Sequence, residues 1–214
     1  MEEITCGEKV LLSGGTDGPP TTPSGTRKDR IVLAQLNVTR DTTKFVNGAF
    51  VGARDVFEFD PGVRIGSDLQ FFSCYQVSST QFIQLKDVEE GAGKVPPPVL
   101  VLHGHFGGSV GDHRRYDAFT LGGPYSLRGY NRSRISAARS ILELATELRI
   151  PVKKSYVYGF AEIGLDLGSS MEVQRRIAHG FSYGVGAKVG LVSAEYSVKH
   201  NSGTGALFFR FGDS

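Results

Sequence analysis

Apolar side chains alternate with polar or small ones over much of the chain, and this alternation restricts the fold more than any other feature. It is clearest in three stretches near the carboxyl terminus, 181–190, 192–198 and 206–211. A strict period of two is typical of a strand with one apolar and one polar face. Such a strand fits a half-buried sheet in water, and it fits equally well a strand that faces lipid on one side and a wet interior on the other. Periodicity does not separate these two interpretations.

The same pattern, interrupted by turn signals, continues through most of the chain. We expect strands at about 30–40, 48–60, 73–88, 97–108, 137–152, 155–166, 180–190, 191–200 and 204–212. The 28 glycines, 14 phenylalanines and 8 tyrosines are typical of many strands joined by turns. Residues 1–28 are rich in Gly, Pro, Ser and Thr, and we expect them to form an irregular arm or long loop.

The segment 137–152 is ambiguous. Its residues are strong helix formers and, taken alone, favour an amphipathic helix. With a period of two, Leu142, Leu144 and Leu148 form one face, and Glu143 and Glu147 lie on the other. A strand is therefore allowed although helix propensity opposes it.

Charge and cysteine content exclude several classes of protein. The 24 basic and 22 acidic residues are dispersed and give a net charge of +2, so charge does not indicate nucleic acid as a partner. Cys6 and Cys74 follow no spacing pattern, and two unpaired thiols are the simpler expectation. The first residues do not resemble a secretory signal or a transit peptide. No stretch has the roughly 20 apolar residues of a spanning helix, a criterion that does not detect membrane strands.

Motifs for covalent chemistry or cofactors are weak or absent. His103 and His105 share a face of a predicted strand, with Asp112 and His113 nearby, but no third ligand stands at a fixed spacing. The glycines of 184–190 lack the spacing and the following helix of a dinucleotide fingerprint. We therefore expect no enzyme, no catalytic residue, no cofactor and no metal site.

The most informative stretch is 119–130, which ends in Leu127-Arg128-Gly129-Tyr130. Its glycines, including Gly122 and Gly123, and its proline indicate a compact loop and not a strand. The simple interpretation is a solvent loop with one arginine. The alternative is a loop folded back into an enclosed space, where Arg128 would require a carboxylate partner because an unpaired buried charge is costly.

This stretch resembles the inward-folding loop of the surface-antigen-like superfamily of outer-membrane barrels, in which a hydrophobe-Arg-Gly-aromatic signature is found. The resemblance implies that the loop arginine, here Arg128, meets the acid of an F-x-acid-x-Gly strand. Phe160, Glu162 and Gly164 supply that second motif. It also implies that 137–152 is the strand after the loop.

Within that superfamily the chain is most similar to the protein-import channel of the plastid outer envelope. The similarity spans roughly residues 17–211 and includes DGPPTT (17–22), EEGAGK (89–94), PPPVLVLHGH (96–105), YDAFTLGGPY (116–125) and NSGTGALFFRFG (201–212). It implies an all-β fold, an antiparallel transmembrane β-barrel over residues 29–214. About nine strands of the family's sixteen are present, so we expect a truncated paralogue of the carboxyl-terminal half.

The function implied by the resemblance is passage of precursor proteins across the plastid outer envelope, without covalent chemistry. Partners would be the membrane itself, precursor polypeptides, translocon receptor subunits and another barrel copy, since nine strands closing on themselves leave too narrow a lumen. An inactive truncated paralogue and a soluble all-β interaction domain remain as alternatives. The candidates for the lumen side are Arg54, Glu58, Glu143, Glu147, Arg149, Glu195, Lys199 and Arg210.

Overall fold

The computed structural model describes residues 2–12, 28–65, 69–91, 93–111, 119–121, 127–130, 136–152, 155–168 and 179–211. The strands are β1 (Glu2–Leu12), β2 (Lys28–Asp41), β3 (Lys44–Val46), β4 (Ala49–Ile65), β5 (Gln70–Gln84), β6 (Val99–Gly111), β7 (Phe119–Leu121), β8 (Ser136–Ala138), β9 (Ser140–Val152), β10 (Ser155–Asp166), β11 (His179–Val189), β12 (Val192–Lys199) and β13 (Gly205–Phe211). Within these ranges no helix has the length and apolar character needed to cross a membrane.

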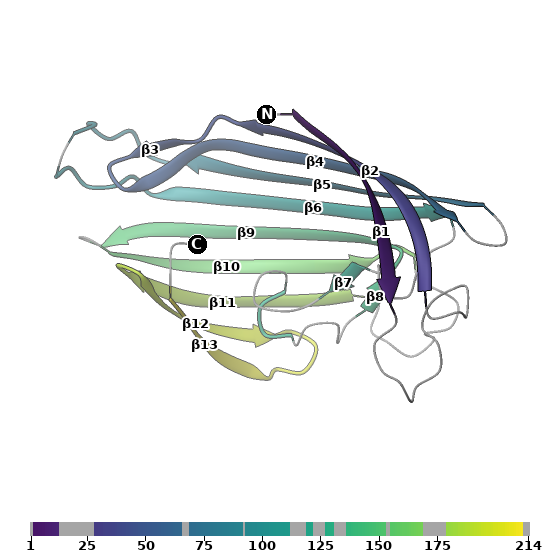
Figure 1. Ribbon diagram of the computed structural model, residues 1–214. Helices are drawn as coiled ribbons and strands as arrows, with labels where there is room; N and C mark the ends of the chain where they lie inside the picture. Colours follow the sequence, from purple (N-terminus) through teal and green to yellow (C-terminus); the bar gives the residue numbers. More distant parts are fainter. Residues whose placement is uncertain are drawn as a thin grey trace.

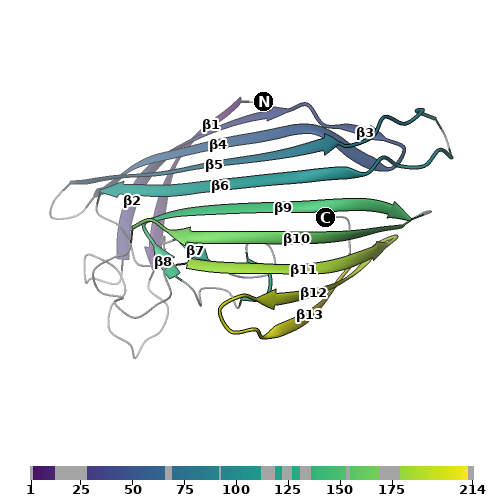
Figure 2. The same ribbon diagram turned by 180° about the vertical axis from the view of Figure 1, so that it is seen from behind.

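One antiparallel sheet contains almost all of the strands. Its order is β1-β2-β4-β5-β6-β9-β10-β11-β12-β13, with the short β3 paired to β4 (Figures 1 and 2). Each long strand therefore lies beside its neighbour in sequence. The exception is the connection from β6 to β9, which contains the separate β7–β8 pair and the segment with Arg128. Strands β1 and β13 form the two edges of the sheet.

The predicted strands are confirmed, including the ambiguous one. Of the predicted segment 137–152, residues 140–152 form β9, because they pair with β6 on one side and β10 on the other, and two ladders of hydrogen bonds outweigh their helix propensity; its first residues belong to the separate strand β8.

Two expectations are wrong. Residues 2–12, predicted to be part of an irregular arm, form β1 and pair along their whole length with β2; residues 13–27 lie outside the described part. Within the predicted loop, Phe119–Leu121 is a short strand paired with Ser136–Ala138.

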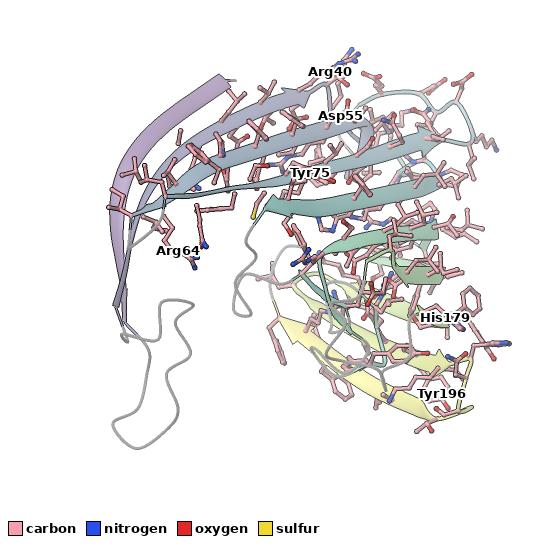
Figure 3. The ribbon with its side chains drawn as sticks, turned by 90° about the vertical axis from the view of Figure 1, so that its right-hand side faces the viewer. Arg40, Asp55, Arg64, Tyr75, His179 and Tyr196 are labelled. Atoms are coloured by element: carbon pink, nitrogen blue, oxygen red, sulfur yellow. The ribbon has the colours of Figure 1, made fainter. Side chains whose placement is uncertain are left out.

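The pairing register assigns every side chain of the sheet to one of two faces, because residues opposite each other in a ladder point the same way. We call the face that carries Glu147 and Glu162 the inner face, and the opposite face the outer face. The sheet is curved into an open trough with the inner face on the concave side (Figure 3). Arg64 points into the hollow and Arg40 points away from it (Figure 3).

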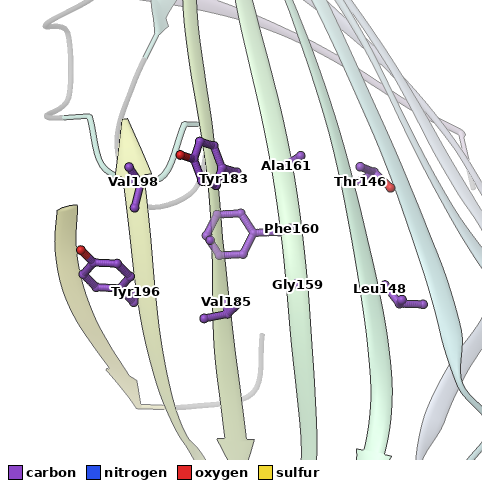
Figure 4. A pocket seen from close by; sticks show the side chains of 10 residues that line it. Thr146, Leu148, Gly159, Phe160, Ala161, Tyr183, Val185, Tyr196 and Val198 are labelled. Carbon is purple, nitrogen blue, oxygen red and sulfur yellow. The ribbon is translucent and has the colours of Figure 1, made fainter. Parts of the chain in front are cut away.

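The outer face is largely apolar and solvent-exposed in the isolated chain. Its exposed side chains include Phe57, Phe71, Leu144, Leu148, Ile150, Val185, Tyr196, Leu207 and Phe209. Between them a shallow apolar hollow of about 540 Å³ lies over the small residues Gly159 and Ala161, bordered by Tyr183, Val185 and Tyr196 (Figure 4). A soluble sandwich would cover this face with a second sheet, and the only other sheet in the described residues is the two-stranded β7–β8.

The buried apolar cluster lies on the inner side. Leu121, Leu127 and Tyr130, from the β6–β9 connection, pack against Ile141 of β9. Their side chains are at most 7% exposed. The core of the described chain is therefore the contact between an inward segment and the concave wall.

Candidate functional site

Arg128 is the centre of a buried ion-pair cluster on the inner face. Its Nε lies 2.5 Å from Glu162 Oε1 of β10, its Nη1 lies 3.1 Å from Glu195 Oε1 of β12, and its Nη2 lies 3.1 Å from Glu147 Oε2 of β9. The backbone N–H of Arg128 also donates to Glu162 Oε2 at 2.8 Å. One guanidinium thus joins three strands through charge-assisted hydrogen bonds, which are stronger than neutral ones.

Strand register explains why three acids so far apart in sequence converge on one cation. Phe160 lies opposite Glu147 in one ladder and opposite Gly184 in the next, and Glu195 lies opposite Gly186. All of these positions therefore face inward. Strand β11 lies between Glu162 of β10 and Glu195 of β12. Its inward residues Gly184 and Gly186 have no side chains, which leaves room on the inner face for the side chain of Arg128.

Further polar groups orient the three carboxylates. Arg149 Nε lies 2.7 Å from Glu147 and Arg210 Nη2 lies 2.5 Å from Glu195. The Tyr158 hydroxyl donates to Glu195 at 2.6 Å. The Ser182 hydroxyl donates to Glu162 at 3.1 Å. Three arginines balance three glutamates, so the cluster is neutral and the cost of burying each charge is offset by a partner.

The residues beside Arg128 place it at this position. The guanidinium carbon lies 3.5 Å from the centre of the Phe160 ring, a cation–π contact. Gly129 has φ +90°, a backbone angle that other residues rarely adopt. A Cβ at Gly164 would overlap the side chain of Leu127. Glycine at these two positions therefore permits the turn and the close approach of the segment to β10.

Tyr130 fixes the other end of the segment. Its hydroxyl donates to the Phe181 carbonyl oxygen at 3.2 Å, and Lys199 Nζ lies 5.5 Å from its ring centre. The segment 127–130 is thus attached to β9, β10, β11 and β12.

The structure places the predicted site residues as follows. Arg128, Glu162, Phe160, Gly164, Leu127, Gly129 and Tyr130 meet at one site. Gly122 and Gly123 lie outside the described residues. By register, all eight candidates for the lumen side (Arg54, Glu58, Glu143, Glu147, Arg149, Glu195, Lys199 and Arg210) lie on the inner face.

Those eight side chains divide into several groups. Glu147, Arg149, Glu195 and Arg210 belong to the Arg128 cluster. Arg54 is separate and exposed, with its Nε 4.0 Å from Asp41. The remaining three are Glu58, which accepts from Asn37 and Gln76, Glu143, which pairs with His105 at 2.9 Å, and Lys199 at Tyr130.

Sequence reasoning missed Tyr158 and Ser182. Tyr158 stands two residues before Phe160, so a period of two would have placed it on the inner face beside the motif. Alternation over 181–190 assigns Ser182 to the polar face, but only the register sets it opposite Glu162.

The other sequence signals form no metal site within the described residues, and Asp112 and His113 lie outside that part of the chain. His103 and His105 do share the inner face, yet no group of three potential metal ligands forms among the described residues. Cys6 lies on β1 and Cys74 lies on β5, with β2 and β4 between these two strands.

Comparison with known proteins agrees with this geometry. The model of the Omp85 superfamily domain matches residues 8–205. Protein TOC75 of Pisum sativum is 60% identical over 216 residues, which are 97% of this chain and 27% of that protein. TOC75-3 of Arabidopsis thaliana is 58% identical over 232 residues, 100% of this chain and 28% of that protein. TOC75-4 of the same plant is 56% identical over 215 residues, 95% of this chain and 54% of that protein.

The chain therefore spans between about a quarter and about half of the length of the curated relatives it matches. The matched residues include every strand from β2 to β12 and, except for Arg210, the whole ion-pair cluster around Arg128. The chain forms an antiparallel sheet with an arginine-bearing segment held on its concave face, and one family model matches most of its length. It is therefore a member of the Omp85 superfamily.

Proposed function

We propose that this chain forms part of the wall of a pore in the plastid outer envelope, through which precursor proteins pass unfolded. The observation that carries the proposal is the pairing of an exposed apolar outer face with a charged inner face that holds a locked segment. The close similarity to chloroplastic TOC75 proteins supports the plastid location and the import role.

The two faces of the sheet suit this role. Strands expose apolar side chains to lipid while every second side chain lines a hydrated interior. The inner face has Asn37, Glu58 and Gln76 opposite one another on β2, β4 and β5. Mixed polar side chains give an unfolded polypeptide few places to adhere, so the wall would allow it to slide.

The Arg128 cluster has a mechanical part in this proposal. Because it joins β9, β10 and β12 to the segment 127–130, it holds that segment inside the trough and sets the space left for a polypeptide. The reaction is transport, and no bond of the precursor is made or broken.

The open edges of the sheet imply further strands beside them in the membrane. An unpaired strand edge in hydrocarbon leaves backbone groups without hydrogen bonds, at a cost of several kcal/mol for each group. Ten strands closed on themselves would give a lumen filled largely by side chains. The edges β1 and β13 are therefore paired in the membrane, with further strands of the same polypeptide, with a second copy of the chain or with a longer relative, and receptor subunits of the translocon would act on that assembly.

A two-part experiment tests the proposal. The tagged chain, imported into isolated plastids, is expected to stay in the envelope after carbonate extraction and to run above its monomer size on native gels. Purified and reconstituted in planar bilayers, the assembly is expected to conduct ions and to be blocked by an unfolded precursor. Release by carbonate would refute the membrane location, and a pore that precursors never block would refute the import role.

A further inference from the structure

A pair of phenylalanines stands at one rim of the trough, away from the Arg128 cluster. Phe45 of β3 and Phe50 of β4 lie opposite each other beside a tight turn, with ring centres 5.3 Å apart in an edge-to-face arrangement. The Phe50 ring lies 6.2 Å from that of Phe82 on β5. The guanidinium of Arg149 lies 6.0 Å from the Phe82 ring centre and 5.5 Å from that of Tyr156.

These rings belong to the inner face. Phe82 lies opposite Val101, and Val101 lies opposite Glu147 of the Arg128 cluster. The contacts thus form a continuous series along the concave wall, from Arg128 at mid-height through Glu147, Arg149 and Phe82 to the rim.

The exposure of the pair is unusual for this face. Phe45 is 67% exposed and Phe50 is 49% exposed, whereas nearby inner positions on β2, β4 and β5 carry polar side chains such as Thr39, Arg54 and Thr80. Lipid does not account for them. Their rings share the concave side with Phe82, whereas the outer side chains in these rows, Val51 on β4 and Ile83 on β5, point away from it.

A hydrogen-bonded clamp holds the pair rigidly. Asn47 and Gly48 form the turn with φ of 47° and 101°, the left-handed angles of a type I′ hairpin. The Asn47 side chain donates to the carbonyl oxygens of Glu89 and Val95, at 2.9 and 3.2 Å, and accepts from the Gly91 N–H at 3.0 Å. Lys94 pairs with Glu89 at 2.6 Å within the same connection. The hairpin tip is therefore fixed to the β5–β6 connection.

We propose that Phe45 and Phe50 form a docking point at which the pore contacts large apolar side chains of an unfolded polypeptide. This inference rests on the proposed import function and names the part of the precursor that the rim recognises. An extended chain displays its aromatic and aliphatic side chains one at a time. Two rigid, exposed rings on a hydrated wall bind such a side chain at little entropic cost, since their own conformation is already fixed.

Other occupants suit the rim less well. A second copy of the chain would pair through the strand edges β1 and β13, which leaves the concave face open. A lipid chain would lie against the apolar part of the outer face. A polypeptide inside the trough meets Phe45 and Phe50 directly and would then move along Arg149 toward the Arg128 cluster.

The test compares three variants of the reconstituted assembly with the parent. Phe45→Ala/Phe50→Ala removes the pair, and the control Phe57→Ala removes a 39%-exposed phenylalanine from the outer face of the same strand. The probes are a synthetic unfolded precursor segment with aromatic and leucine residues and a matched segment with serine in their place. Block of the ionic current by each segment is measured in planar bilayers.

We expect the double variant to bind the apolar segment about tenfold more weakly, the effect of losing one well-packed aromatic contact. Open-pore conductance and block by the serine segment are expected to be unchanged, the Phe57→Ala control to bind as the parent does, and Phe45→Leu/Phe50→Leu to recover most of the affinity. Equal block of parent and double variant by the apolar segment would overturn the docking point and leave the pore intact. A parent assembly that neither segment blocks would overturn the import function itself.

Discussion

Removing Arg128 would show whether the cluster holds the inward segment in place. In an Arg128→Ala variant, Glu147 keeps Arg149 and Glu195 keeps Arg210 and the Tyr158 hydroxyl. Glu162 loses its cation and retains only the backbone N–H of residue 128 and the Ser182 hydroxyl. Its side chain is 5% exposed, so water does not replace the lost partner.

The structure sets the size of the effect. Removing one partner of a buried ion pair costs about 3–5 kcal/mol of unfolding free energy. Glu162→Gln leaves Arg128 with two carboxylates, so we expect about 1.5–3 kcal/mol, the value of one charge-assisted hydrogen bond to a buried group. The Arg128→Ala/Glu162→Gln double variant has no carboxylate charge at position 162 that would be buried without a cation. Its loss of unfolding free energy should therefore be about 2 kcal/mol smaller than the sum of the two single losses.

Urea titration followed by far-ultraviolet circular dichroism of the chain in lipid vesicles measures these differences. Arg54→Ala is the matched control, because the Arg54 side chain is 61% exposed and lies 4.0 Å from Asp41, so its loss should cost less than about 1 kcal/mol. A buried, coupled cluster would be refuted if Arg128→Ala and Glu162→Gln each lost no more unfolding free energy than the control and their losses were strictly additive.

Three further predictions follow from other parts of the structure. Gly164→Ala should loosen the inward segment, because the added Cβ overlaps Leu127; faster proteolysis within 119–130 measures this, and unchanged proteolysis would contradict the packing. Asn47→Ala should free the β5–β6 connection through the loss of three hydrogen bonds, and Asn47→Gly, which keeps the left-handed turn, separates that loss from backbone strain; limited proteolysis of 85–98 is the readout, and protection equal to the parent in both variants would argue against the clamp. Val185→Arg on the outer face should oppose membrane insertion by about 2–4 kcal/mol if Val185 lies near the bilayer midplane, which vesicle flotation detects; normal insertion would place that face away from lipid.

The positions and faces of the long strands could be predicted from the sequence. A period of two is a local property, so the inner and outer side chains of β11, β12 and β13 could be assigned before any partner was known. The pairing of Arg128 with Glu162 was implied by resemblance to a family, through two short motifs, and does not follow from the local pattern.

Local pattern was insufficient elsewhere. Residues 2–12 have a mixed composition, and only pairing with β2 makes them a strand. The helix propensity of 137–152 was overcome by ladders on both sides.

For the long strands with strict alternation, the sequence by itself determined which residues form strands and which side chains share a face, because a period of two depends only on neighbours along the chain. Only the tertiary structure decided that Glu147 and Glu195 join Glu162 around Arg128, and that Asn47 reaches the β5–β6 connection. These contacts depend on the register between strands and on the paths of connections. A shift of one residue in register would turn a whole strand over, and no local pattern specifies which residues of separate strands come to lie opposite each other.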